Sequence, residues 1–410
     1  MWLAAWPVVA AMALSNEPTP LYVLWQHQIG FTTATLTLIY AGYIAGLLVS
    51  LSLGGPLADR YGRRPVLLPG LVLGLVATAL FITAHSVAVL GLARLLSGIA
   101  VGAVLSAGMA AVSDLAPDGD KRLAGLIASA SMVGGAAVGP LLTGVLSQTL
   151  PAPAVTVFVV QLFLLLGALL LVPRMPLPPI RADAAAAKGR WLRLPSVPRP
   201  HRRSLWVSLA VFAPAITATG FVLSLGPALL AQLLRTDNRL LSGGLVFLLF
   251  AAATGVQFAV RRLRVPVLFQ VGAALTVVAM AALVTAVALT SVPLLLTAAV
   301  LSGLGQGTSQ LGGLSTLAAV VPATHLARAN AALTAGGYLL AGTLPVAAGY
   351  LSDAAGLTAG TTAFGIAVAA LAVIGAVAAR AHHTFPAPAR ARAEEPRQIA
   401  PTAPGREEAS

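Results

Sequence analysis

Cysteine is absent from the 410 residues, and charged residues make up only 9% of them. Without cysteine there is no disulfide, no thiolate metal site and no cysteine nucleophile. A soluble domain carries about 25% charged residues, whereas 58% of this chain is apolar. The apolar runs also lack the short alternation of a transmembrane β-barrel. The fold class that remains is an all-α membrane protein.

Long apolar runs fill most of the chain. A helix needs about 20 such residues to cross ~30 Å of hydrocarbon, and the sequence predicts twelve spans. They form an N-terminal six-helix bundle (1–173) and a C-terminal one (204–380), joined by a basic linker (174–203). Residues 381–410 are rich in proline and lack a core-forming pattern, so we expect a disordered tail. The predicted spans are 2–25, 33–54, 66–84, 87–112, 123–147, 154–173, 204–231, 241–260, 266–289, 293–321, 329–351 and 357–379.

Lysine and arginine occur in alternate connections between the spans. Cytoplasmic connections hold an excess of these residues. The opposite connections hold only Arg235 and Arg239. We therefore expect a plasma (inner) membrane protein with both termini in the cytoplasm, and topology explains the net charge of +13 better than nucleic-acid binding does. The basic connections hold Arg60, Arg63 and Arg64; Lys121 and Arg122; the linker; Arg261, Arg262 and Arg264; Arg328; and the tail from Arg380.

The two halves repeat each other at a shift of 205 residues. Spans four and five match spans ten and eleven in this way, which predicts pseudo-twofold symmetry between two six-helix halves. Parallel repeats of this kind build alternating access in transporters. The matched pairs are Gly98 and Gly303, Gly102 and Gly307, Gly108 and Gly313, Pro117 and Pro322, Pro140 and Pro345, and Gly144 and Gly349.

The connection after span two reads GPLADRYGRR, from Gly55 to Arg64. Gly62 permits a tight turn, and Asp59 is placed to cap a helix or to bond a facing arginine. The arginines alone would be an ordinary positive-inside loop. The whole string resembles the signature loop of the major facilitator superfamily. The resemblance implies a conformational latch between the halves, formed by Gly55, Asp59, Arg60, Gly62, Arg63 and Arg64.

Span four carries Arg94, followed by Gly98, Gly102 and Ser106 on one helical stripe. Small residues on such a stripe let a neighbouring helix approach, and a charge inside the bilayer indicates function. The pattern resembles the span-four motif of the same superfamily, which implies a role in proton coupling. A structural ion pair is the alternative.

Glu17 is the acid expected inside a span core, at nearly the same depth as Arg94, roughly 10–12 Å below the outer surface at 1.5 Å per residue. We expect Glu17 and Arg94 to lie close together or to share the central cavity. A proton and a substrate could then compete for one carboxylate.

Span five contains Gly135, Gly139, Pro140 and Gly144. Close helix packing around a proline kink is the simple interpretation. The string also resembles the antiporter motif of the superfamily, although Thr143 stands where many members have glycine. The resemblance favours exchange of substrate for proton, with other modes of transport as alternatives.

Polar and aromatic side chains in several spans are candidates for lining the cavity, because polar groups facing lipid would be unsatisfied. Interhelical hydrogen bonding or packing is the alternative for each. The candidates are Glu17, Tyr40, Tyr43, Thr217, Phe221, Gln306, Gln310, Asn330 and Tyr338.

The function that these features predict is secondary active transport by alternating access. Proton-driven efflux of a lipophilic drug-like molecule is favoured, and transport of a sugar, an amino acid or another metabolite is the alternative. A sensor would need a folded cytoplasmic module, and a membrane enzyme would need clustered catalytic groups, whereas His27, His85, His201 and His325 are scattered. We expect a monomer in the lipid bilayer that binds its substrate and protons and needs no cofactor, metal or nucleic acid.

Overall fold

The computed structural model describes residues 2–115, 121–177, 197–235 and 237–381. Helices form nearly all of these ranges, which contain no strand. Short 3₁₀ turns, η1 (Thr19–Leu21), η3 (Val172–Arg174) and η4 (Arg199–His201), adjoin the longer helices. The α-helices are α1 (Trp2–Asn16), α2 (Tyr22–Ile29), α3 (Thr33–Tyr61), α4 (Arg64–Ile82), α5 (Val87–Asp114), α6 (Lys121–Thr149), α7 (Pro153–Leu171), α9 (Arg202–Leu234), α10 (Arg239–Val260), α11 (Val265–Ala288), α12 (Val292–Val320), α13 (Ala323–Ala355) and α14 (Leu357–Ala381).

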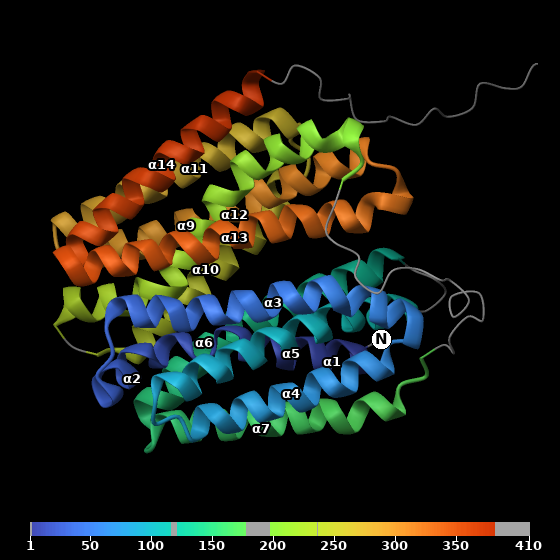
Figure 1. Cartoon of the computed structure of the whole chain (residues 1–410), viewed down its shortest axis with the longest axis horizontal. Coiled ribbons are helices and arrows are strands. Elements are labelled where there is room, and N and C mark those ends of the chain that lie inside the picture. The colour runs from blue at the N-terminus through green and yellow to red at the C-terminus, as the bar shows by residue number, and fades with distance from the viewer. Residues whose placement is uncertain (1, 116–120, 178–196, 236, 382–410) are drawn as a thin grey trace, which may run out of the picture.

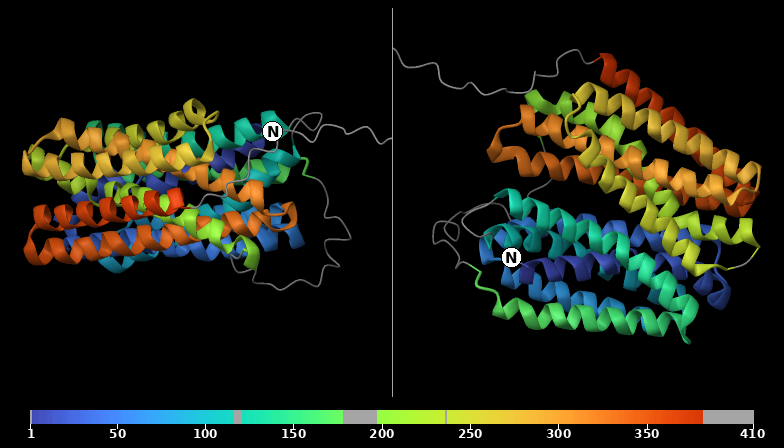
Figure 2. Two further views of the ribbon diagram at one scale, coloured as in Figure 1. Left: turned by 90° about the horizontal axis from the view of Figure 1, so that it is seen from above. Right: turned by 180° about the vertical axis from the view of Figure 1, so that it is seen from behind.

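The helices form two bundles that lie side by side (Figures 1 and 2). One half contains α1 to α7, and the other contains α9 to α14. We call the end of the molecule with the N-terminus and the turns at 62–63 and 261–264 the proximal end. The opposite end, with the turns at 30–32 and 289–291, is the distal end. The two halves lie close together at the distal end, and their ribbons diverge toward the proximal end.

Eleven continuous helices within the described ranges are long and apolar enough to cross a membrane. The remaining span is the first, and it is interrupted: α1 ends at Asn16, η1 follows, and α2 resumes at Tyr22. Pro18 and Pro20 cause the break, because neither can donate the backbone hydrogen bond that would continue the helix. With α1 and α2 counted as one broken span, the expected twelve-span fold is confirmed.

Four helices that begin at the distal end are capped by their own sequence. The side chains of Thr32, Ser86, Asn238 and Ser291 accept hydrogen bonds from backbone N–H groups in the first turns of α3, α5, α10 and α12. Such residues satisfy amide groups that have no partner inside the helix. Local sequence therefore fixes where these spans start.

Glycines set the distance between neighbouring helices in both halves. A methyl group added at Gly98 of α5 would overlap the carbonyl oxygen of Tyr43 in α3. At the matched position, a methyl group on Gly303 of α12 would overlap the carbonyl oxygen of Leu249 in α10. Glycines at matched positions thus let neighbouring helices approach closely in both halves. The 205-residue repeat is therefore present in the packing as well as in the sequence.

Several predicted boundaries differ from the structure. Span two was expected to end at residue 54, but α3 continues to Tyr61, so the segment from Gly55 is helical until the turn at Gly62. Helix α9 begins at Arg202, close to the predicted end of the linker. The middle of the linker, 178–196, and the predicted disordered tail from 382 lie outside the described residues.

Candidate functional site

Arg94 lies at the centre of the N-terminal half with no exposed surface. Its Nε donates a hydrogen bond to the hydroxyl of Tyr22 at 2.6 Å, and its Nη1 donates one to the carbonyl oxygen of Ser15 at 2.8 Å. In a continuous helix that carbonyl would accept from the N–H of residue 19. The break in the first span therefore supplies an acceptor for a buried guanidinium, while the Nη2 atom has no partner.

Tyrosine rings surround the same guanidinium. Its central carbon lies 5.2 Å from the ring centroid of Tyr22, 6.0 Å from that of Tyr40 and 5.4 Å from that of Tyr43. A cation over an aromatic face is attracted by the negative charge density of the ring. Tyr338 of the other half lies within electrostatic range of Tyr40. The structure thus brings Arg94 together with two of the predicted lining residues, Tyr40 and Tyr43.

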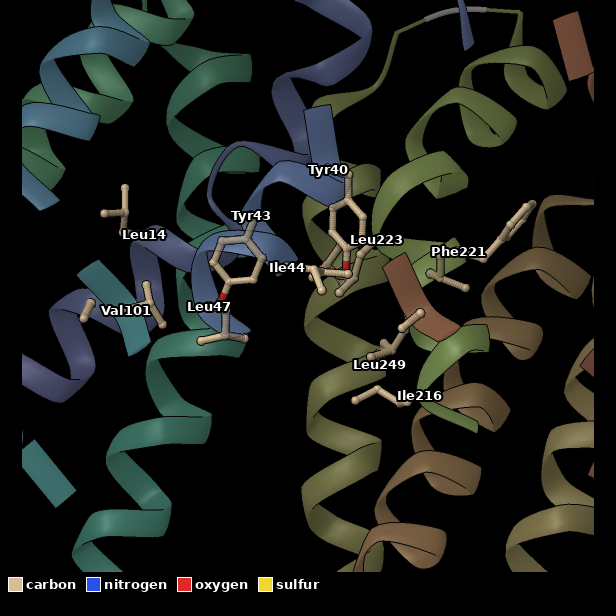
Figure 3. Packing of buried hydrophobic residues seen from close by; sticks show 14 of the residues in the cluster. Leu14, Tyr40, Tyr43, Ile44, Leu47, Val101, Ile216, Phe221, Leu223 and Leu249 are labelled. Carbon is tan, nitrogen blue, oxygen red and sulfur yellow. The ribbon is translucent and has the colours of Figure 1, made fainter. Parts of the chain in front are cut away.

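These rings lie where the two halves meet. Figure 3 shows Tyr40 and Ile44 of α3 next to Leu223 of the other half, with Tyr43 farther from it. A methyl group added at Gly342 of α13 would stand 3.5 Å from Ile44, so the halves touch directly here. The tyrosine cluster is therefore part of the interface that must change when the halves move.

Glu17 follows the end of α1 and is 4% exposed, and its Oε2 atom has no hydrogen-bond partner. Arg94 contacts the chain only two residues earlier, at Ser15. No ion pair joins the two charged side chains, both of which are described. Both residues are thus found near the break in the first span, without a direct ion pair between them. A shared role in proton coupling stays a prediction.

Tyr22 and Ser15 were not among the predicted site residues. Ser15 acts through its backbone carbonyl, so its side-chain type gave no signal. Tyr22 lies one turn beyond Pro18, on the continuation of the span that holds Glu17. The prolines were visible in the sequence, but the position at which the chain resumes a helix depends on packing.

In the C-terminal half, Gln306 and Gln310 lie one turn apart on α12. The amide nitrogen of Gln306 donates to the side-chain oxygen of Gln310 at 3.4 Å, while the Oε1 atom of Gln306 is buried without a partner. The Oδ1 atom of Asn330 in α13 is also buried without a partner. These oxygens are available to a donor that enters the bundle.

Thr217 and Phe221 do not have the surroundings expected of lining residues. Both have no exposed surface, the hydroxyl of Thr217 donates to the carbonyl of Ala213 at 2.7 Å, and Phe221 stacks on Phe364 with ring centroids 4.0 Å apart. In this structure their side chains are used for packing inside the half, and their role as lining residues stays a prediction.

The predicted latch occupies the last turns of α3 and the start of α4. Gly62 has a φ of +91° and ends α3, as expected for a residue that must leave the helix sharply. The Nε of Arg63 lies 3.2 Å from a carboxylate oxygen of Asp114, and Arg64 donates to the carbonyl of Met175. These contacts lie within the N-terminal half. The side chain of Asp59 lies outside the described residues.

The span-five glycines pack against two different helices. Gly135 and Gly139 face α1, where a methyl group on Gly139 would lie 2.7 Å from the carbonyl oxygen of Ala13. Gly144 faces α10 of the other half, where an added methyl group would lie 2.7 Å from the carbonyl oxygen of Arg239, and Pro140 packs against Gly243 there. The motif thus joins the broken first span on one side to the opposite half on the other.

Polar contacts between the halves are concentrated at the distal end of the described chain. The carboxylate of Asp353 accepts from the backbone N–H groups of Thr33 and Ala34, and the side-chain oxygen of Gln148 accepts from the backbone N–H of Arg239. His27 lies 3.2 Å from Asp237 across the same interface. The distal end is therefore closed in this structure.

A comparison with known protein families gives a match over residues 1–281 to the family described as Major Facilitator Superfamily. The chain belongs to the major facilitator superfamily. It is accordingly a multi-pass membrane protein of that family, which confirms the resemblance seen in its signature loop.

Curated relatives include two proteins named for drug resistance. The quinolone resistance protein NorA of Staphylococcus aureus is 26% identical over 129 residues, which are 32% of this chain and 33% of NorA. The multidrug transporter MdfA of Escherichia coli is 27% identical over 207 residues, 50% of this chain and 48% of MdfA. The alignments thus span about a third to a half of these relatives.

Solved structures of other transporters share the fold. A bacterial homolog of the human lysosomal transporter Spinster, in an inward-facing and occupied conformation, superposes with a TM-score of 0.73 at 14% identity, covering 93% of this chain and 95% of the other. The nucleoside transporter NupG superposes with a TM-score of 0.71 at 13% identity, covering 93% and 99%. At these identities the likeness concerns the fold alone.

Proposed function

We propose that this protein is a proton-coupled exporter that exchanges protons for lipophilic drug-like molecules by alternating access. It acts as a monomer in the plasma membrane with both termini in the cytoplasm. In this orientation the distal end, where the two halves are joined by hydrogen bonds, faces outward. The excess of arginine in the proximal connections supports the orientation.

The observation that carries the proposal is the pair of buried charges at the break of the first span. Glu17 has an unpartnered carboxylate oxygen, and the guanidinium of Arg94 has an unpartnered Nη2 atom. The Nη1 atom of the same guanidinium bonds the carbonyl of Ser15, two residues before Glu17. Ionisable side chains inside a membrane protein are costly and mark ion or proton pathways. The tyrosine cluster beside them offers flat apolar faces to an aromatic or lipophilic substrate.

The names of the relatives NorA and MdfA support drug efflux over metabolite transport. The test is a pair of strains, one lacking the gene and one overexpressing it, compared for resistance to chemically diverse toxic compounds. We expect overexpression to raise resistance to several lipophilic compounds. Unchanged resistance to every compound would contradict drug efflux and favour a metabolite as the substrate.

Proton coupling is tested separately with purified protein in proteoliposomes and an imposed pH gradient. Glu17→Gln should lower gradient-driven transport by about tenfold or more, because losing an interaction of only ~1.4 kcal/mol in the rate-limiting state has that effect. Glu17→Asp, which keeps the carboxylate, is the matched control. If the Glu17→Gln protein transports as well as the unmodified protein under the pH gradient, the role of Glu17 in proton coupling is contradicted.

A further inference from the structure

Two hydrogen-bonded contacts at the distal end are related by the internal repeat. Asp353, near the end of α13, accepts from the backbone N–H of Thr33 at 2.8 Å and of Ala34 at 2.9 Å. Gln148, near the end of α6, accepts from the backbone N–H of Arg239 at 3.1 Å. The shift of 205 residues carries Gln148 onto Asp353 and Ala34 onto Arg239. We call these contacts the distal clasps.

Each clasp satisfies amide groups at the start of a helix in the opposite half. The first N–H groups of a helix have no partner within it. The side chains of Thr32 and Asn238 already accept from residues farther into α3 and α10. The amides of the first helical residues are left for the other half. Separation of the halves at this end would break both clasps, and these amide groups would then be hydrogen-bonded by water.

Glycines make room for both clasps. A methyl group added at Gly144 would lie 2.7 Å from the carbonyl oxygen of Arg239, and one at the matched Gly349 would lie 3.0 Å from the Cα atom of Ala34. The same two helix ends therefore meet through close backbone contact as well as through hydrogen bonds. The distal clasps are part of a built interface that both halves form with equivalent residues.

We propose that Asp353 and Gln148 are gating residues that hold the distal end closed in the inward-open state. The inference rests on the alternating-access function proposed above. The two clasps differ in strength, because Asp353 carries a negative charge that is favourable at the positive end of α3, and hydrogen bonds to ionised groups are stronger than neutral ones. The clasp formed by Asp353 is therefore the stronger one, and the clasp formed by Gln148 is its uncharged counterpart.

The experiment measures the distance between the halves at the distal end. Because the chain has no cysteine, cysteines placed at His85 and Thr358, both exposed, carry the only spin labels in the purified full-length protein. Double electron–electron resonance then gives the fractions of short, closed distances and long, open ones. No substrate is needed for this measurement.

Asp353→Asn should raise the ratio of open to closed molecules by about tenfold, within the range for loss of a charge-assisted bond at a helix start. Asp353→Glu should restore most of the closed fraction. Gln148→Glu should lower the open fraction, because it places a charge at the start of α10. Gln232→Ala, which removes an exposed glutamine of α9 at the same end, should leave the distances unchanged.

An unchanged distance distribution in a folded Asp353→Asn protein would overturn the proposal. If the Asp353→Asn protein does not fold, the Gln148→Glu variant is the test. The absence of a shift toward short distances in that variant would also overturn the proposal. The outcome is independent of the substrate. If the Asp353 variants shift the distances as expected but the protein transports none of the tested compounds, the gating role stands and the proposed drug efflux is contradicted.

Discussion

At the scale of single residues, the burial of Arg94 requires an explanation, because a charge in hydrocarbon is costly. Its compensation comes from a backbone carbonyl, a tyrosine hydroxyl and the faces of three tyrosine rings. A carboxylate partner would neutralise the guanidinium permanently. Dipoles and rings compensate the charge in this structure, and the Nη2 atom of Arg94 stays unpartnered.

The hydroxyl of Tyr22 should contribute measurably to stability. Tyr22→Phe keeps the ring but leaves the Nε of Arg94 without an acceptor, which should cost about 1.5–3 kcal/mol. Arg94→Lys should also destabilise, because an ammonium cannot reproduce the planar fork of donors. The measurement is the midpoint of thermal unfolding of the detergent-solubilised protein. Tyr350→Phe, at a 57% exposed tyrosine, is the matched control and should be nearly neutral.

Equal thermal midpoints for the Tyr22→Phe and Tyr350→Phe variants would contradict this assignment. They would mean that the ring contacts alone hold the guanidinium, with the hydroxyl playing no part.

The sequence predicted part of the candidate site at this scale. It singled out Tyr40 and Tyr43, whose rings the structure places at Arg94, and Tyr338, which lies near Tyr40. It also placed Glu17 and Arg94 at a similar depth. Depth follows from counting residues along straight spans, but the direction of each side chain does not. The hydrogen bond to Ser15 could not be predicted, since it depends on a carbonyl that only the broken helix exposes.

At the scale of elements, the first span differs in kind from the other eleven. Irregular backbone inside a membrane protein is tolerated where other groups satisfy it, and here Arg94 bonds one of the carbonyls near the break. Proline residues also lie within α6, α9 and α13, yet those helices continue through them. Two prolines in close succession, at Pro18 and Pro20, remove hydrogen bonds on the same turn and end α1.

Glycine positions on α5 and α12 should be sensitive to a single added methyl group. Gly98→Ala and Gly303→Ala would each push a methyl into a backbone carbonyl of the neighbouring helix. Overpacking of this kind costs about 1–3 kcal/mol. Gly91→Ala, on α5, and Gly255→Ala, on α10, meet no atom within 4 Å and serve as controls.

Thermal unfolding of the four variants compares them directly. We expect Gly98→Ala and Gly303→Ala to lower the midpoint of thermal unfolding. The two controls should leave the midpoint unchanged or raise it, since alanine favours helix more than glycine does. A drop for Gly98→Ala without one for Gly303→Ala would show that the repeat does not extend to the energetics of packing.

Element boundaries were predicted well at one end and less well at the other. Distal starts follow the capping residues Thr32, Ser86, Asn238 and Ser291, which can be recognised in the sequence. The proximal end of α3 extends to Tyr61 because helical hydrogen bonding continues beyond the apolar run. Hydropathy detects the apolar run alone, so it could not place that end.

At the scale of the whole molecule, the internal repeat also relates the contacts between the two halves. Matched residues close both interfaces at the distal end, Gly144 with α10 and Gly349 with α3. The sequence predicted the two halves, but which end is closed depends on the packing between them and was not predicted.

The orientation of the molecule in the membrane can be tested with two single-cysteine variants. Thr290 lies in an exposed turn at the distal end, and Arg262 lies in an exposed turn at the proximal end. Because cytoplasmic connections collect arginine, a membrane-impermeant maleimide should label Thr290→Cys in intact bacterial cells and Arg262→Cys only in inverted membrane vesicles. The unmodified protein has no thiol and gives the background. The reverse labelling pattern would place the closed distal end on the cytoplasmic side and require the clasps to gate the opposite face.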